Sequence, residues 1–309
     1  MRAHWEKVRD SWLSLCDEAR DLENENNRLF REAYGLVDGA SHRPSREGIS
    51  MLRATFDRKS TAQDLVSFAV GCMFGRYSLD EPGLILADQG ATLDDYLKQI
   101  PIPTFAPDAD NVIPIVDGDW FEDDIVARFR QFLRVAFGGQ HFEENLRFVT
   151  ESLGVKDLSD YFAKRGARAT SSQFYDDHVQ RYKKRPIYWL FSSPKGSFNA
   201  LIYMHRYTSS TVSTVLNEYL REYRAKLESS LHHHERLAAG GGTARQQAAA
   251  QKEADRLRKV LVELEEYEHD VLYPLASQQI DIDLDDGVKA NYSKFGAALK
   301  KIPGLEASE

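Results

Sequence analysis

The residues best suited to chemistry in this 309-residue sequence lie in one segment that is rich in cationic and aromatic side chains. Residues 163–226 contain twelve Lys or Arg, four Asp or Glu, and 11 of the 34 aromatic residues. Cationic side chains neutralise phosphates, and aromatic rings stack on unpaired bases. This composition predicts a nucleic-acid-binding region, and the alternative is a solvated basic face over an aromatic core.

The candidate DNA contacts surround one predicted β-hairpin. The run Arg-Tyr-Lys-Lys-Arg at 181–185 directly precedes the hairpin, and Lys195 lies in its turn. Lysine suits phosphate oxygens, whereas Asn and Arg also suit base edges in a groove. We assign Lys183 and Lys184 to phosphates. The predicted DNA-binding residues, of which the last two are favoured for bases, are Arg181, Lys183, Lys184, Arg185, Ser192, Ser193, Lys195, Asn199 and Arg206.

The net charge of −8 conceals this segment, because a total charge averages over regions of opposite sign. A net acidic chain argues against nucleic-acid binding. Residues 163–226, however, carry +8, and the rest of the chain carries −16. The charge of this segment by itself therefore favours a DNA-binding role.

Cysteine content and hydropathy indicate a cytoplasmic protein. Two cysteines, Cys16 and Cys72, are too few for a disulfide framework or a four-cysteine zinc site, and they fit a reducing compartment. The N-terminus lacks the apolar core of a secretory signal. No apolar stretch reaches the length of a membrane span, so we expect no membrane partner.

Motifs of the common enzyme classes are missing from the sequence. It contains no G-x-x-x-x-G-K-[ST], no G-x-G-x-x-G, no H-E-x-x-H and no G-x-S-x-G. The aspartates at 281–285 lack the glycine and the final glutamate of a calcium loop, and the histidines at 232–234 point apart on a helix. The acidic run at 117–124 is typical of a helix N-terminus rather than of paired catalytic acids. We therefore predict no catalytic residues and no metal site in this chain.

Helices are the main elements that must position the candidate contacts. Residues 1–34 have apolar residues at heptad spacing, with Asn26 on the seam. This pattern predicts one long helix, which is either part of a coiled coil or a core helix. Asp117 or Asp119 is expected to cap a helix that begins at 121. The helices predicted after the first are 61–77, 121–137, 145–153 and 158–164.

The strongest β signal is the aromatic and branched stretch that contains the strands 187–191 and 199–204. Two long helical patterns follow and flank Gly240–Thr243. They predict an antiparallel helical hairpin whose second helix is capped by the threonine and ended by Pro274. The polar and apolar alternation at 280–284 predicts a small strand near the end.

Together these patterns predict an α+β fold that is predominantly α, with long helices, an antiparallel helical hairpin and a small β-hairpin-containing target-recognition region. The predicted divisions are a heptad helix and loop (1–60), a helical and proline-rich connecting region (61–162), a basic aromatic β-hairpin region (163–211), and a helical hairpin with a C-terminal segment (212–309).

Five stretches of the sequence resemble the PglX-type adenine-specific DNA methyltransferases of BREX phage-defence systems. The hairpin stretch and AVGCMFGRYSLDE are the most specific of them. In family order, they are ENENNRLFREAYGL (23–36), DLVSFAVGCMFGRYSLDEPGLI (64–85), DNVIPIVDGDWFEDDIVARFRQFL (110–133), KRPIYWLFSSPKGSFNALIYMHRY (184–207) and IDLDDGVKANYSKFGAAL (282–299).

The resemblance implies that this chain is a part of such a protein. Family members are much longer, and their amino-terminal part carries the S-adenosylmethionine pocket and an Asn-Pro-Pro-Tyr motif, neither of which occurs here. The chain resembles the C-terminal portion, so we expect no cofactor in it and S-adenosylmethionine on the missing catalytic part. A fragment, a split-gene subunit and a truncated relative all remain open.

Two functions follow from these expectations. The first is a DNA-recognition module for double-stranded DNA that has no catalysis of its own and serves restriction-modification in phage defence. The second is a protein-interaction module that docks the catalytic methyltransferase half or other BREX proteins through its coiled-coil helices. A self-contained methyltransferase is disfavoured by the missing motifs.

Overall fold

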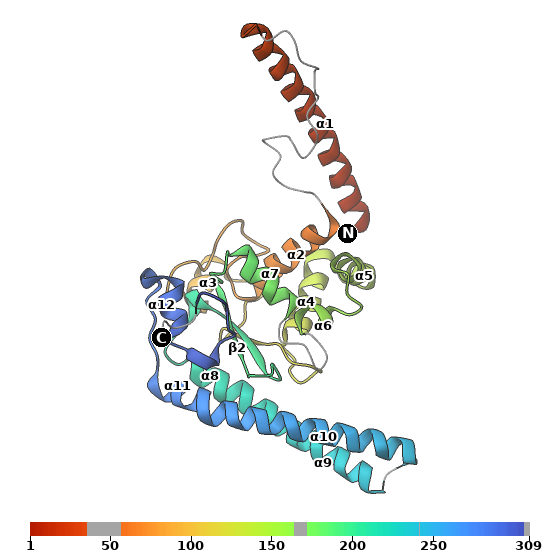
Figure 1. The fold of residues 1–309 in the computed structure, drawn as a ribbon, viewed down its shortest axis with the longest axis vertical. Helices are drawn as coiled ribbons and strands as arrows, with labels where there is room; N and C mark the ends of the chain where they lie inside the picture. Colours follow the sequence, from red (N-terminus) through yellow and green to blue (C-terminus); the bar gives the residue numbers. More distant parts are fainter. Residues whose placement is uncertain (36–56, 164–171, 241, 306–309) are drawn as a thin grey trace.

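The computed structural model describes residues 1–35, 57–163, 172–240 and 242–305. Most of these residues are helical, and one small antiparallel sheet lies among the helices (Figure 1). The predicted fold class is therefore confirmed. In chain order, the elements are α1 (Arg2–Ala33), α2 (Arg58–Met73), α3 (Leu93–Gln99), β1 (Val112–Pro114), α4 (Ile125–Phe137), η2 (Gly139–His141), α5 (Phe142–Leu153), α6 (Leu158–Phe162), α7 (Gln173–Arg181), β2 (Tyr188–Ser192), β3 (Asn199–Tyr203), η3 (Met204–Arg206), α8 (Thr211–Thr214), η4 (Val215–Leu220), α9 (Arg221–Gly240), α10 (Ala244–Tyr267), η5 (Glu268–Leu272), α11 (Tyr273–Gln278), η6 (Leu284–Asp286), α12 (Gly287–Ser293) and η7 (Gly296–Ala298).

The predicted β-hairpin is present as β2 and β3, and a third strand that the sequence did not predict completes the sheet. The strand order is β1-β3-β2, and both pairs are antiparallel. Ile202 of β3 pairs with Trp189 on one side and with Val112 on the other. The β1 strand has three residues, which is too short for an alternation pattern to be recognised.

Other parts of the chain cover both faces of the sheet. Alternate residues of β2 point to opposite faces, and each set packs against a different segment. Trp189 and Phe191 pack edge-on against Phe295 near the C-terminus. Tyr188 instead stacks against Phe74 at the end of α2, with ring centroids 5.2 Å apart. The sheet thereby joins the early and late parts of the chain into one apolar core.

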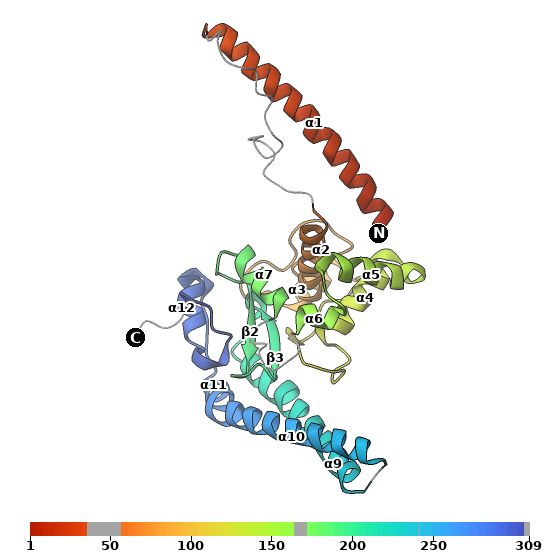
Figure 2. The same cartoon turned by 45° about the vertical axis from the view of Figure 1, so that its right-hand side comes forward.

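The helical hairpin is formed by α9 and α10, which lie side by side and extend away from the body (Figures 1 and 2). Thr243 caps α10 as predicted, in a reciprocal capping box with Gln246. Each helix is joined to the body through a π-helical segment, η4 or η5. Arg221 and Arg224 of α9 both bind the Glu268 carboxylate of η5 at this junction.

Several predicted boundaries were wrong. The prediction that Pro274 ends the second arm is wrong, because the helix continues through η5 into α11 and Pro274 is the second residue of α11, directly after the π-helical segment. The strand predicted at 280–284 is a loop followed by the 3₁₀ turn η6. Side chains satisfy its backbone instead of a neighbouring strand, since Gln89 binds Ile282 and Leu284.

The helix predicted from 121 begins at Ile125, and its cap is Asp124 rather than Asp117 or Asp119. The Asp124 carboxylate accepts a hydrogen bond from the Ala127 amide at 2.7 Å. The acidic run contains several aspartates that could cap a helix, so the sequence alone does not determine the cap or the first residue of α4.

Helix α1 confirms the single helix predicted at the N-terminus, and its first turns contact the body. Arg2 forms an ion pair with Glu151 at 2.6 Å, and the Trp5 indole donates to Thr61. Beyond these contacts the helix projects outward (Figure 2). Most of the loop that the sequence places after this helix, at 36–56, lies outside the described residues.

Candidate nucleic-acid interface

The interface begins at the end of α2, where two glycines fix the path of the chain. Gly75 has a φ of +75°, and the amides of Arg76 and Tyr77 both donate to the Gly71 carbonyl. A Cβ atom on Gly71 would lie 2.3 Å from Cδ2 of Tyr77. Glycine is required at this position because the Tyr77 ring packs directly on the helix backbone.

The guanidinium of Arg76 is held among tyrosines. Its Nη1 donates to the Tyr203 hydroxyl at 3.0 Å, and its Nε donates to the Tyr77 hydroxyl at 3.4 Å. Its Cζ lies 5.5 Å from the centre of the Tyr77 ring and 6.0 Å from that of Tyr203. Burial disfavours the charged form of Arg76, but the tyrosine interactions outweigh this and raise its pKa. The cation is therefore held in one position by its neighbours.

Two consecutive lysines end α7 in a backbone conformation that usually requires glycine. Lys183 and Lys184 have φ of +51° and +62°, and their amides bind the carbonyls of Gln180 and Val179. A non-glycine residue in this region costs about 1–2 kcal/mol. The side chains of both lysines, and that of Arg185, are exposed.

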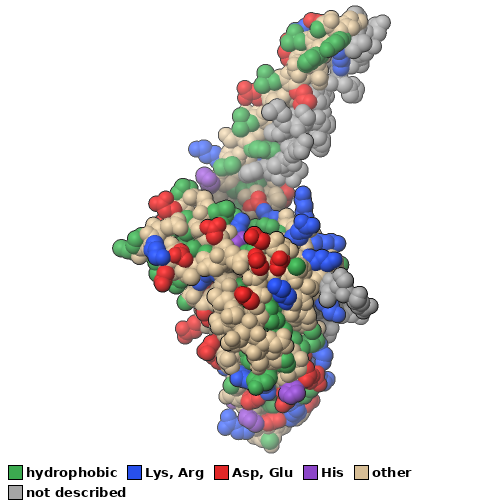
Figure 3. All heavy atoms as spheres, turned by 90° about the vertical axis from the view of Figure 1, so that its left-hand side faces the viewer, with side chains coloured by type: hydrophobic (Ala, Val, Ile, Leu, Met, Phe, Trp, Pro, Cys, Tyr) green, Lys and Arg blue, Asp and Glu red, His purple; other side chains and the backbone are tan. Residues whose placement is uncertain are grey.

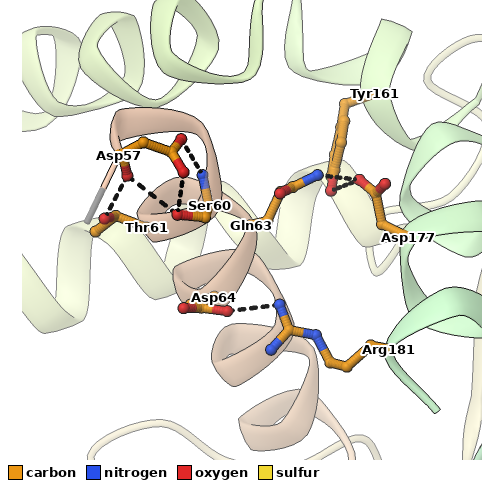
Figure 4. Close-up of polar contacts among 8 residues, drawn as sticks. All are labelled: Asp57, Ser60, Thr61, Gln63, Asp64, Tyr161, Asp177 and Arg181. Carbon is orange, nitrogen blue, oxygen red and sulfur yellow. Dashed lines mark hydrogen bonds and ion pairs between the residues drawn. The ribbon is translucent and has the colours of Figure 1, made fainter. Parts of the chain in front are cut away.

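Contacts between α2 and α7 join the two helices that these cations follow (Figure 4). The Asp177 carboxylate accepts hydrogen bonds from Gln63 and from the Tyr161 hydroxyl, both at 2.7 Å. Arg181, a predicted DNA contact, forms an ion pair with Asp64 at 2.5 Å. Arg181 thus serves the junction of the two helices, and its charge is compensated.

Arg76 and the end of α7 share two neighbouring rings, His178 and Tyr182. Burial first, and then the charges of Arg181 and Arg76, lower the pKa of His178 to about 3. The neutral ring accepts a hydrogen bond at Nε2 from the Tyr188 amide. Both arginines also act on Tyr182, whose pKa burial raises.

We call the cations and tyrosines that follow α2 and α7 the α2–α7 surface. Figure 3 shows Lys and Arg side chains gathered at one side of the body, at the height of α2 and α7. Sequence reasoning did not select Arg76, which lies about 100 residues before the other cations; its only signal was the specific GCMFGRY stretch. The surface comprises Arg76, Tyr77, Tyr182, Lys183, Lys184 and Arg185.

Other predicted contacts lie at the opposite end of β2, around the hairpin turn. Glu263 of α10 is 3% exposed, and it accepts hydrogen bonds from the hydroxyls of Ser193 (2.6 Å) and Ser197 (2.5 Å). It also accepts one from the Lys195 amide at 2.7 Å. The turn is therefore clamped to the arm, and the Lys195 side chain projects outward. The five residues of β2 place this turn roughly 17 Å from the α2–α7 surface.

The remaining predicted contacts face inward. Ser192 is 6% exposed, and the Asn199 amide donates to the Gly196 carbonyl. Arg206, favoured for reading bases, is also 6% exposed and donates to the carbonyls of Asp108 and Ala109. These three side chains support the turn and the core. Lys164, Arg165 and Arg168, which contribute to the basic segment, lie outside the described residues.

A second group of titratable residues lies next to β1 and η4. Burial, reinforced by the charge of Asp110, raises the pKa of Asp108 to about 7. The Tyr219 hydroxyl donates to Asp110 at 2.9 Å, and the Val112 amide donates to both carboxylates. Within the described ranges, no group of three or more His, Cys, Asp or Glu residues is placed to hold a metal ion.

Comparison with known proteins gives the class of this chain. Over 98% of its length it is similar to proteins named as adenine-specific methyltransferases. It is 35% identical over 331 aligned positions to the adenine-specific methyltransferase BrxX of Escherichia coli O9:H4 (strain HS), and 35% identical over 305 positions to the adenine-specific methyltransferase PglX of Lacticaseibacillus casei (strain Zhang). The resemblance to PglX-type methyltransferases is thereby confirmed.

The chain spans about a quarter of the length of these relatives, 27% of the first and 24% of the second. No protein-family model matches the sequence. Among the described helices, none is both long and apolar enough to cross a membrane.

Proposed function

We propose that this chain is the DNA-recognition portion of a BREX-type adenine-specific methyltransferase and that S-adenosylmethionine binds to another part of that protein. The relatives are adenine-specific methyltransferases by name, and DNA is the substrate that this name implies for them. The observation that carries the proposal is the pair of exposed lysines at positive φ at the end of α7. Strained residues of this kind cluster at functional sites.

The role follows from the needs of adenine methylation. A methyltransferase must extrude its target base from the duplex, so it must hold the phosphate backbone on both sides of that base. Lys183, Lys184 and Arg185 supply flexible or forked cations for phosphates at one end of the sheet. Lys195 supplies another cation at the far end, on a turn that Glu263 fixes.

Duplex binding by the full chain, measured against salt concentration, tests the proposal. The variant Lys183→Glu/Lys184→Glu is expected to weaken binding at least tenfold and to reduce the salt dependence by about two phosphate contacts. Lys252→Glu/Lys259→Glu, which makes the same change of charge at exposed positions on α10, is the control and is expected to bind normally. Equal binding by the wild type and the α7 variant would rule out this surface as the DNA-binding site.

A protein-interaction role is the second candidate, and an apolar stripe on α1 favours it. Leu15, Leu22 and Leu29 are 60%, 65% and 51% exposed and recur at heptad spacing. The test is co-purification with the remaining part of a PglX-type methyltransferase. Leu22→Glu/Leu29→Glu is expected to abolish the association, whereas Asn24→Glu/Arg31→Glu, on another side of the helix, is expected to preserve it.

A further inference from the structure

Arg76 is half-buried, and among the described residues no carboxylate is paired with it or is a main influence on its pKa, whereas Asp108 acts on both Arg128 and Arg206. The neighbours of Arg76 are neutral hydroxyls, and the Tyr203 hydroxyl that it binds donates its own hydrogen to the Leu86 carbonyl. Arg206, in contrast, is satisfied by two main-chain carbonyls inside the core. Arg76 makes its hydrogen bonds to the described residues through Nε and Nη1, which leaves Nη2 without a partner among them.

Other cations lie in the same part of the surface. Arg76 and Arg181 both act on Tyr182. Lys183 and Lys184 follow Tyr182 directly in the chain and have exposed side chains, and Arg181 is already paired with Asp64. A half-buried charge costs free energy unless an opposite charge compensates it. The charge of Arg76 therefore lacks a compensating anion among the described residues.

We propose that Arg76 binds a backbone phosphate of DNA, together with the ammonium groups of Lys183 and Lys184. This inference rests on the proposed DNA-recognition function and deepens it by assigning the chemical group that this surface contacts. Arg76 presents the two hydrogens of Nη2, and its position is set by Tyr77 and Tyr203 before the phosphate arrives.

The same geometry makes the contact independent of base sequence. The amides of Arg76 and Tyr77 are bonded to Gly71, and those of Lys183 and Lys184 to the last turn of α7. The side chains of Arg76, Lys183 and Lys184 remain available, and these three are cations suited to phosphate. Binding through this surface is therefore strongly salt-dependent and equal for different sequences.

The experiment measures binding of the full chain to several short duplexes of unrelated sequence over a range of salt concentrations. Arg76→Gln is expected to weaken binding to every duplex about tenfold and to lower the salt slope by about one phosphate. Tyr77→Phe keeps the charge and removes one support, so it is expected to weaken binding less and to leave the slope unchanged. Arg76→Lys keeps the charge if Arg76→Gln fails to fold, and it is expected to retain the slope with reduced affinity.

The outcomes separate this inference from the proposed function. Wild-type binding and slope in Arg76→Gln, with loss of binding in Lys183→Glu/Lys184→Glu, would overturn the phosphate role of Arg76 and leave DNA recognition standing. Weakened binding to one duplex sequence alone would overturn it in favour of a base contact. A wild-type chain that binds no duplex would overturn both.

Discussion

The α9–α10 arm and α1 are both long helical extensions with apolar residues at heptad spacing, but they differ in where that seam lies. In the arm, Leu227, Leu257 and Leu264 are at most 1% exposed, because each helix covers the other. In α1, Leu15 and Leu22 are more than half exposed. A heptad repeat thus indicates that a helix forms an interface but does not identify the partner helix. In the arm, the short turn after Gly240 places α10 against α9.

This difference has consequences for stability. Burying a leucine side chain stabilises the folded protein by about 1.5–3 kcal/mol. Each buried leucine between α9 and α10 makes a contribution of this size. Helix α1 has exposed ion pairs such as that of Arg28 with Glu25, which solvent screens and which therefore contribute little to stability. We therefore expect α1 to open more readily than the arm.

The largest expected effect compares the two seams directly. Leu257→Ala removes a fully buried side chain and is expected to cost about 2–5 kcal/mol of unfolding free energy. Leu22→Ala makes the same chemical change on α1 and is expected to stay within about 0.5 kcal/mol. Urea unfolding measures both, and similar losses in the two variants would contradict the contrast.

The second prediction compares how the two extensions are attached to the body. Glu263→Ala leaves Ser193, Ser197 and the Lys195 amide without their acceptor, at a cost of about 2–3 kcal/mol. Arg2→Ala removes an ion pair whose side chains are 43% and 45% exposed, so it is expected to change the melting temperature only slightly. Thermal melting provides the measurement, with Glu263→Gln as a control that retains one acceptor oxygen.

The third prediction concerns pH and the root of the arm. Asp108 has its pKa raised to about 7 in the folded state, first by burial and then by Asp110, while Arg128 and Arg206 oppose the shift and Asp123 and Tyr219 lie nearby. The folded protein therefore holds a proton that the unfolded chain releases above its ordinary pKa near 4. Stability from this group is present at low pH and is lost as the pH rises from about 4 to 7.

Urea unfolding between pH 5 and 8 tests this sign. The wild type is expected to lose stability over that range by about 1–2 kcal/mol, and Asp108→Asn is expected to lose less, since its amide does not titrate. The same pH dependence in both proteins would exclude Asp108 as its source. Unlike the arm, α1 does not contact this pair, and its opening is expected to be unaffected.

The smallest expected effect concerns the strained end of α7. Lys183→Gly/Lys184→Gly relieves two positive φ angles, and we expect unfolding free energy to rise by no more than about 1 kcal/mol, because glycine also loses more entropy on folding. The same variant is expected to bind duplex DNA more weakly, because both cations are gone. A variant that is less stable than the wild type would show that the lysines serve the helix end rather than DNA.

The sequence predicts elements that local patterns determine and misses those that distant parts of the chain determine. The hairpin at 188–203 is recognised because aromatic and branched residues flank a Pro-Lys-Gly turn, and the threonine cap of α10 because glycines precede it. The strand β1 exists only through its pairing with β3, about 90 residues later. No local signal could reveal it.

The candidate site follows the same rule. The exposure of Lys183 and Lys184 agrees with their prediction as DNA contacts from the composition of the segment. The sequence alone could not distinguish them from Arg206, whose guanidinium donates to two carbonyls of a loop about 100 residues earlier. Arg76 was missed for the same reason, since its proximity to α7 depends on the contacts of Gln63 and Asp64.

The paired π-helices at the root of the arm determine where a single residue can be removed without disturbing the arm. A π-turn closes its hydrogen bonds five residues along and so accommodates more residues per turn than an α-turn. Deleting one residue from Val215–Leu220 or from Glu268–Leu272 is therefore expected to return that segment to α-helical geometry and to leave α9 and α10 in register. Deleting one residue between Arg221 and Leu227, in contrast, would rotate the rest of α9 by about 100° and turn Leu227 away from α10.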